Sequence, residues 1–150
     1  AAWGTSGSLR AWQAAALKTY MTDMPEDFLA VATPGAGKTT FTRGLLRGLG
    51  YAGAVKSPTY TIVESYILPQ FALHHFDLYR FASPEEWEDA GLDELFASDC
   101  VCLIEWPQQG GGFTPPADIT VSLNHTDGGR ACTLTAHTAN GRKSLEAWLN

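Results

Sequence analysis

The sequence predicts an α/β fold built around a central mixed β-sheet. An apolar run at residues 28–32 has the character of a buried strand, and a glycine-rich turn connects it to a helical segment at 41–49. Further short apolar runs are bounded by proline, glycine and aspartate, which is typical of additional strands. With 150 residues, 45% of them hydrophobic, the chain has the size and composition of one domain with one core. We therefore expect residues 1–150 to form a single domain.

The first half of the chain is expected to alternate helices and strands. Ser8 is a suitable helix cap, and apolar side chains follow it at helical spacing. Apolar and polar residues alternate over 59–68, which indicates a strand with one buried face. In order, we expect a helix from Ser8 to about Tyr20, a strand over 28–32, a helix over 39–49, a short strand from Val55 to Ser57, and a hairpin of residues 59–68 and 71–77.

The second half begins with a strong helix-start signal. Ser83 is suited to the N-cap, Pro84 to the first helical position and Glu86 to the return contact of a capping box. This helix should end near Gly91. Beyond it, we expect a helical turn over 92–96, a buried strand over 100–106, a glycine- and proline-rich loop over 110–116, a hairpin of 119–123 and 131–136 joined by 127–129, and a helix over 142–149.

The turn after the first predicted strand matches a phosphate-binding pattern. Residues 32–40 read Ala-Thr-Pro-Gly-Ala-Gly-Lys-Thr-Thr, which fits [AG]-x-x-x-x-G-K-[ST] in the strand–turn–helix context that this motif requires. A glycine-rich turn with a surface lysine is the alternative interpretation. The context favours a P-loop NTPase-like, three-layer fold. The residues expected to bind the nucleotide here are Gly35, Ala36, Gly37, Lys38, Thr39 and Thr40.

The chemistry of this loop indicates ATP or a similar triphosphate together with Mg²⁺. Gly35 and Gly37 give the backbone the freedom to point successive N–H groups at phosphate oxygens. Lys38 is expected to reach the β- and γ-phosphates, where it would act in catalysis. The hydroxyl of Thr39 is expected to ligate Mg²⁺, because this ion takes oxygen ligands and is usually shared with substrate phosphates.

Two acidic residues are candidates to complete such a site. Glu105 ends the apolar run 101–104, where a carboxylate would be costly unless Mg²⁺ or Lys38 paired with it. A solvated glutamate at a strand end is the alternative. Asp77 ends the other strand and could polarise the attacking water or hold a metal-bound water. Helix capping or pairing with Arg80 is its alternative role.

Several other residues are weaker candidates. Trp106 could cover the nucleotide or fill the edge of the core. Arg130 follows a flexible turn and could reach the base or a phosphate, and the hydroxyl-rich loop 57–61 is suited to sensing a γ-phosphate. His74 and His75 are adjacent on a predicted strand, so their side chains should face opposite ways, and a structural role is favoured for both.

Composition excludes some classes of protein. A net charge of −6, from ten basic and sixteen acidic residues, argues against a protein that grips duplex DNA electrostatically. Cys100 and Cys102 should point to one face of their strand and are interpreted as reduced core thiols. No run approaches the ~18 apolar residues needed to span a bilayer, and no signal pattern is seen, so we expect a cytoplasmic protein without a membrane partner.

Three downstream segments together with the loop carry a family resemblance. These are the segments 55–64 (Val-Lys-Ser-Pro-Thr-Tyr-Thr-Ile-Val-Glu), 75–80 (His-Phe-Asp-Leu-Tyr-Arg) and 103–107 (Leu-Ile-Glu-Trp-Pro). Over about residues 35–150 the chain closely resembles the TsaE (YjeE) family. The resemblance implies a cytoplasmic ATPase, weak alone and activated by partners. It also implies that TsaD- and TsaB-type proteins are those partners in the t6A37 modification of tRNA, with the tRNA contacted through their complex.

The same resemblance implies roles for individual residues. In the family the loop binds ATP, and the threonine after the lysine and the strand-end glutamate hold Mg²⁺. The aspartate of the histidine–phenylalanine–aspartate segment supports hydrolysis, and an arginine after a late glycine turn lies near the nucleotide. These roles correspond to Thr39, Glu105, Asp77 and Arg130.

The N-terminal segment resembles a different family. Residues 1–40 are similar to the N-terminus of DEAD/DEAH-type helicases, in which a glutamine, here Gln13, contacts adenine. The first three loop positions also depart from the Gly-Asp-Leu usual in TsaE proteins. Because the two resemblances meet in the segment 35–41, the pattern suggests a hybrid of two P-loop proteins.

The favoured function is therefore a slowly hydrolysing ATPase whose output is conformational. Loss of the γ-phosphate would relax the loop 57–61 and change the surface offered to a partner. Two alternatives remain open at this point. One is a nucleotide-gated binding module with incidental hydrolysis, and the other is a helicase fragment, although the chain is short for two motor lobes.

Overall fold

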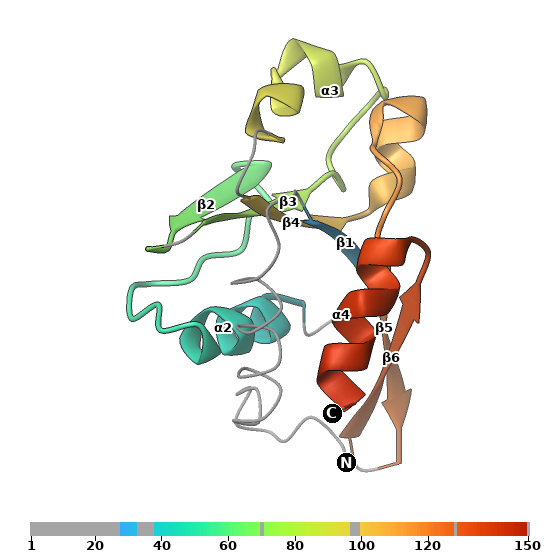
Figure 1. Ribbon diagram of the computed structural model, residues 1–150. Helices are drawn as coiled ribbons and strands as arrows, with labels where there is room; N and C mark the ends of the chain where they lie inside the picture. The colour runs from blue at the N-terminus through green and yellow to red at the C-terminus, as the bar shows by residue number, and fades with distance from the viewer. Residues whose placement is uncertain (1–27, 33–37, 70, 97–99, 128, 150) are drawn as a thin grey trace.

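The fold is a six-stranded sheet with helices on both faces. The computed structural model describes residues 28–32, 38–69, 71–96, 100–127 and 129–149 (Figure 1). The predicted helix from Ser8 to Tyr20 lies outside these residues. In chain order the elements are β1 (Phe28–Ala32), α2 (Lys38–Gly48), β2 (Val63–Ile67), β3 (Ala72–Asp77), α3 (Glu86–Asp89), η1 (Leu92–Leu95), β4 (Cys100–Glu105), η2 (Pro107–Phe113), β5 (Ile119–Thr126), β6 (Gly129–Ala136) and α4 (Ala139–Leu149).

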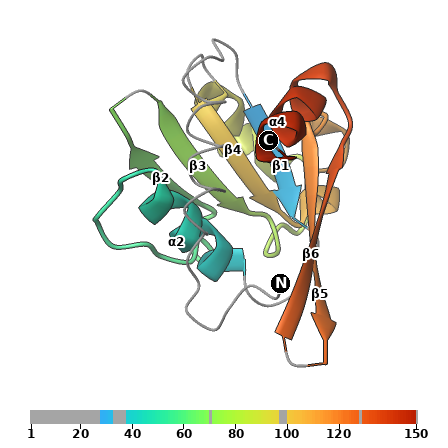
Figure 2. The ribbon, with the colours of Figure 1, turned by 60° about the horizontal axis from the view of Figure 1, so that its bottom comes forward.

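The sheet is mixed, as the sequence predicts. Its strand order is β2-β3-β4-β1-β5-β6, which Figure 2 shows face on. The four central strands β3, β4, β1 and β5 pair in parallel, whereas β2 and β6 join their neighbours antiparallel at the two edges. Each edge strand belongs to a predicted hairpin. The carboxyl ends of the central strands therefore meet at one edge of the sheet, where α/β proteins commonly bind ligands.

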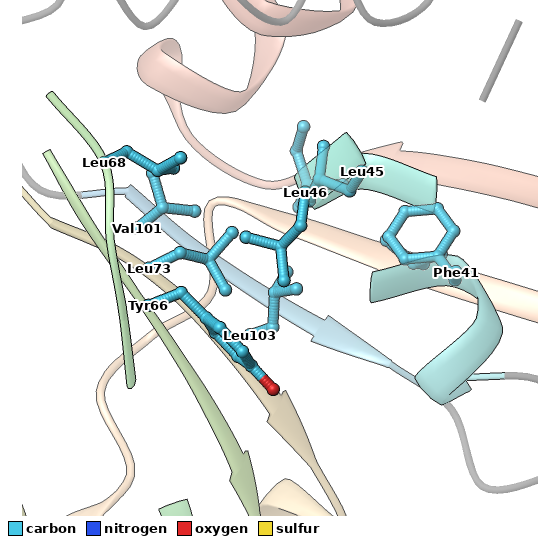
Figure 3. Packing of buried hydrophobic residues seen from close by; sticks show 10 residues of the cluster. Phe41, Leu45, Leu46, Tyr66, Leu68, Leu73, Val101 and Leu103 are labelled. Carbon is cyan, nitrogen blue, oxygen red and sulfur yellow. The ribbon is translucent and has the colours of Figure 1, made fainter. Parts of the chain in front are cut away.

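One face of the sheet is covered by α2 and, beside β6, by α4. Figure 3 shows Leu46 of α2 directed at the side chains of β3 and β4, with Phe41 and Leu45 on the same helix. Leu46 is fully buried in this layer. The cluster comprises Phe41, Leu45, Leu46, Tyr66, Leu68, Leu73, Val101, Leu103, Ile119 and Val121, and Leu145 of α4 packs against it.

The other face packs against α3, η1 and η2. Trp87 of α3 is fully buried, stacks on Phe76 at a centroid distance of 5.9 Å, and donates its indole N–H to Asp93 at 2.7 Å. Cys100 and Cys102 lie on this face with their sulfurs 3.8 Å apart, as their spacing predicts. The two packed faces give the predicted three layers.

The predicted strand at Val55 is not observed. Residues 51–57 have no regular structure, although Val55 packs against the α2 core cluster. The backbone here is held by a side chain: Lys56 N–H donates to the Tyr66 hydroxyl at 3.1 Å, and that hydroxyl donates to the Lys56 carbonyl at 3.3 Å. Tyr66 thus satisfies the groups that a strand partner would satisfy.

The predicted hairpin forms, but its first strand is shorter than expected. Residues 58–62 make a turn in which Ile62 N–H donates to the Pro58 carbonyl at 2.8 Å, so β2 begins only at Val63. Ile62 has a left-handed backbone with φ of 69°, which a strand cannot contain. The alternation of apolar and polar residues therefore predicts a strand where residues 58–62 form a turn.

The glycine-rich segment 110–112 is not a simple loop. It lies within the 3₁₀ helix η2, which has a proline at its start and a kink at Gly111, where φ is 51° and ψ is −135°. Only glycine adopts this backbone readily. Gly110 is buried, and a Cβ there would lie 2.1 Å from the Thr114 hydroxyl oxygen. Glycines that are typical of a loop therefore allow the backbone to pack closely against the Thr114 side chain here.

Two helix boundaries differ from the prediction. Glu86 accepts the Ser83 N–H at 3.1 Å, which is half of the expected capping box, but regular helix begins at Glu86 rather than Pro84. Gly91 follows α3 with φ of 65°, as a helix-ending glycine should. The last helix begins at Ala139 because Thr138 accepts the Gly141 N–H at 3.0 Å. Within the described residues, none of the helices has the length and apolar character to cross a bilayer.

We predict that Leu46→Ala lowers the free energy of unfolding by about 2–5 kcal/mol, because it leaves a cavity between α2 and the sheet. Urea unfolding monitored by circular dichroism measures the change. The matched control is Arg47→Ala, which changes an exposed residue on the same helix and should stay within ~0.5 kcal/mol of the wild type. Equal stability of the two variants would contradict this packing.

Candidate functional site

The two candidate carboxylates lie side by side at the carboxyl edge of the sheet. In the parallel register, Asp77 of β3 pairs with Glu105 of β4, and Glu105 pairs with Ala32 of β1. Ala32 is the residue from which the phosphate-loop motif departs. The topology thus brings together both acidic candidates and the start of the loop, although they are far apart in sequence.

Glu105 is buried and held by a histidine. Its carboxylate accepts a hydrogen bond at 2.7 Å from Nε2 of His75, a residue of β3 that is 1% exposed. Alternation along the strand turns His75 to the same side of the sheet as Asp77 and Glu105. The glutamate is therefore not the solvated strand-end residue of the alternative interpretation.

Asp77 is the centre of a small hydrogen-bond network. Its Oδ1 accepts the Tyr79 N–H at 2.9 Å, and its Oδ2 accepts the Thr59 hydroxyl at 3.3 Å. The Thr59 hydroxyl is also 2.8 Å from that of Ser57, and Asp77 N–H donates to the Ile62 carbonyl. The carboxylate therefore caps the turn after β3 and ties the hydroxyl-rich loop to the sheet.

The phosphate-binding segment is described only in part. Gly35, Ala36 and Gly37 lie outside the described residues, as do the side chains of Lys38 and Thr40. The backbone shows α2 beginning at Lys38, and the Thr39 side chain is half-buried in the first turn. This turn carries no acidic residue, so the positive end of the helix dipole is not neutralised locally.

Aromatic side chains surround the turn after β3. Trp106 follows Glu105 with a left-handed backbone, φ 58°, packs partly against the core face covered by α3, and lies 5.1 Å from the Tyr79 ring. The Arg80 guanidinium lies 4.2 Å from the ring centroid of Tyr60, which is 81% exposed. The contacts of Trp106 match its core-edge interpretation, while its cover of a nucleotide stays a prediction.

His74 faces away from this site, as the alternation predicts. Its Nδ1 lies 2.7 Å from the Ser65 hydroxyl, and its ring lies edge-on to Phe76 on the opposite face. Burial lowers the pKa of His74 below its ordinary value. The neutral ring, with Nδ1 accepting from Ser65, therefore suits this position.

The remaining predicted residue is Arg130, which lies on β6 opposite His125 in the register. Its side chain lies outside what the structure describes, so its contact with a nucleotide stays a prediction.

The residue that sequence reasoning undervalued is His75. Its signal was the two-residue spacing from Asp77 on one strand, which places both side chains on one face.

Comparison with known proteins gives a consistent family. The family model described as Threonylcarbamoyl adenosine biosynthesis protein TsaE matches residues 10–132. A tRNA threonylcarbamoyladenosine biosynthesis protein TsaE from Haemophilus influenzae is 49% identical over 116 residues, covering 77% of this chain and 73% of the relative. The protein of the same name from Bacillus subtilis is 51% identical over 103 residues, covering 68% and 64%.

Structural comparison agrees with the fold. The crystal structure of Bacillus subtilis YdiB matches with a TM-score of 0.68 and 28% identity, over 95% of this chain and 90% of that chain. The predicted P-loop NTPase-like fold is thereby confirmed. The helicase-like resemblance of residues 1–40, and with it the hybrid, receives no support, because the family match begins at residue 10. Gln13 itself lies outside the described residues.

We predict that His74 makes the folded state sensitive to acid. Because its pKa is lowered by folding, the unfolded chain binds the extra proton first, so this contribution to stability is present above pH ~6.5 and is lost as pH falls through the folded-state pKa. His74→Gln should therefore lose less stability than the wild type between pH 8 and pH 5, as measured by urea unfolding. An identical loss in both proteins would contradict the assignment.

Proposed function

The chain belongs to the TsaE family, and from this premise we propose that it binds and hydrolyses ATP in the t6A37 modification of tRNA. The proposed activity is weak in the protein alone and is raised by a complex of TsaD- and TsaB-type partners. The tRNA would be reached through that complex. The observation that carries the proposal is the row formed by Asp77, Glu105 and the start of the phosphate-loop motif.

The residues of this row suit Mg²⁺ bound with a nucleotide. Mg²⁺ takes oxygen ligands and is usually held by one or two carboxylates or hydroxyls together with phosphates and water. Glu105 supplies a carboxylate, and Thr39 supplies a hydroxyl in the first turn of α2, while the neighbouring Asp77 would hold a metal-bound water. Among the described residues, no group of three or more His, Cys, Asp and Glu is arranged to hold a metal. When bound, Mg²⁺ would neutralise charge on the β- and γ-phosphates.

The residues of the chain have separable roles in this proposal. Lys38 and the backbone at the start of α2 bind phosphate oxygens, because charge and helix dipole both favour an anion there. Glu105 would hold the Mg²⁺ ion, and Asp77 orients water for attack on the γ-phosphate. Positioning and electrostatic stabilisation account for most of the catalysis of phosphoryl transfer.

The output would be transmitted through the hydroxyl-rich loop. Thr59 bonds Asp77 directly, and Ser57 bonds Thr59, so a change at the γ-phosphate reaches the loop through two hydrogen bonds. The neighbouring Tyr60 and Tyr79 are exposed, at 81% and 55%, beside this network. We propose that this surface changes between nucleotide states and is offered to the partner complex.

We predict that Lys38→Ala abolishes partner-stimulated ATP hydrolysis, because it removes the cation that binds the phosphates, and that Glu105→Gln lowers kcat by roughly 100-fold, because it weakens the hold on the Mg²⁺ that would neutralise them. Hydrolysis is measured with and without TsaD- and TsaB-type partners. The matched control is Asp89→Asn, which changes an exposed carboxylate on α3 and should leave the rate unchanged.

Hydrolysis by Lys38→Ala at the wild-type rate would refute this account. A nonhydrolysable ATP analogue that supported repeated rounds of tRNA modification would instead favour the nucleotide-gated binding module. Stimulation by RNA or DNA alone, without protein partners, would favour a helicase-like activity. The three results are distinct, so one set of assays decides among the functions.

A further inference from the structure

We propose that His75 is a positioning residue that fixes the orientation of the Glu105 carboxylate for the metal–nucleotide complex. The inference rests on the proposed function, because it concerns the same site. Nε2 of His75 lies 2.7 Å from Oε1 of Glu105, and the two side chains are 1% and 10% exposed. Nothing in the sequence motif alone assigns this histidine a role.

The two strands that carry the pair are rigidly placed. His75 pairs with Leu103 in the register, whereas Glu105 pairs with Asp77, so the contact runs diagonally between β3 and β4. Both strands have neighbours on each side in the sheet. The imidazole is therefore held by the centre of the sheet, and its contact restricts the Glu105 side chain at the strand end.

The tautomer follows from the partner. A carboxylate only accepts hydrogen bonds, so Nε2 carries the hydrogen and Nδ1 of a neutral ring has a lone pair. Nδ1 is buried and has no hydrogen-bond partner among the described residues. The contact with Glu105 is thus the polar interaction that the structure shows for this ring.

An unsatisfied buried nitrogen argues against a purely structural role. Each buried polar group without a partner destabilises the fold, and an apolar side chain at this position would avoid that cost. The chain places apolar residues at neighbouring buried positions, Leu73 and Phe76. We infer that the histidine is present for its hydrogen bond to the carboxylate.

The hydrogen bond should set which way the second carboxylate oxygen points. With Oε1 held by His75, rotation of the carboxylate group is restricted. Residues that orient a metal ligand in this way typically change metal affinity by roughly 10–100-fold when removed. His75 itself need not touch metal or nucleotide, so it is not a catalytic residue.

The test compares three variants of the full chain. His75→Leu removes the donor, and His75→Gln keeps an amide N–H at a similar reach. His74→Leu is the matched control, because it changes the adjacent histidine on the opposite face. For each protein, binding of a nonhydrolysable ATP analogue is measured by calorimetry at pH 8 in Mg²⁺ and in EDTA, and Mn²⁺ binding to the nucleotide complex by electron paramagnetic resonance.

We expect His75→Leu to weaken Mn²⁺ binding by roughly 10-fold or more, and His75→Gln by less than about threefold. Nucleotide affinity in EDTA should stay unchanged in both, because the phosphates are bound by the loop. His74→Leu should match the wild type in all three measurements. Thermal unfolding of every variant shows whether the fold is kept.

Several outcomes would overturn the positioning role. They are an unchanged Mn²⁺ affinity in His75→Leu, an equal loss in His75→Gln, or a parallel loss in EDTA that shows a structural defect. If His75→Leu does not fold, Mn²⁺ binding is measured in His75→Asn instead, because the Asn amide is too short to reach Glu105. A wild type without metal-dependent nucleotide binding would overturn the proposed function, and this inference with it.

Discussion

The parallel pairing of β1, β3 and β4 in one register is the constraint on which the candidate site depends. It places Asp77, Glu105 and Ala32 in a row at one edge of the sheet. The packing of α2 against one face and of α3 against the other fixes the strands that carry this row. A slip of one residue in any of the three strands would turn its side chains to the opposite face. The core and the site are therefore products of the same register.

The polar groups at this edge are joined into two networks that meet at β3. One runs from His75 to Glu105 and is closed to solvent. The other runs from Asp77 through Thr59 to Ser57 and opens toward the surface. The buried network holds the Glu105 carboxylate, whereas the open one links the Asp77 carboxylate to the hydroxyl-rich loop 57–61. The two networks thus hold two neighbouring carboxylates on one face of the sheet.

The sequence predicted most of the sheet because its strands are strongly apolar and bounded by clear turn residues. It also placed Asp77 and Glu105 at strand ends, and the structure shows them adjacent. It failed where tertiary contacts replace local pairing: the Tyr66 hydroxyl holds the segment predicted as a strand at Val55. It also underrated His75: the two-residue spacing from Asp77 indicates the face of His75, but not its contact with Glu105, which lies 30 residues away in the sequence. The sequence pattern therefore predicts where a helix or strand ends and which of its faces is buried, but it does not predict which distant side chains make contact.

Ile62 and Trp106 are the non-glycine residues of the described chain with a left-handed backbone. Both adjoin the acidic row: the Ile62 carbonyl accepts the Asp77 N–H, and Trp106 directly follows Glu105. A left-handed conformation costs a residue with a Cβ roughly 1–2 kcal/mol. Glycine at either position would relieve this strain, but it would remove a side chain that packs against the core face covered by α3 and would loosen the turns that aim the two carboxylates. The chain thus trades thermodynamic stability for a fixed geometry at the points where its proposed chemistry requires it.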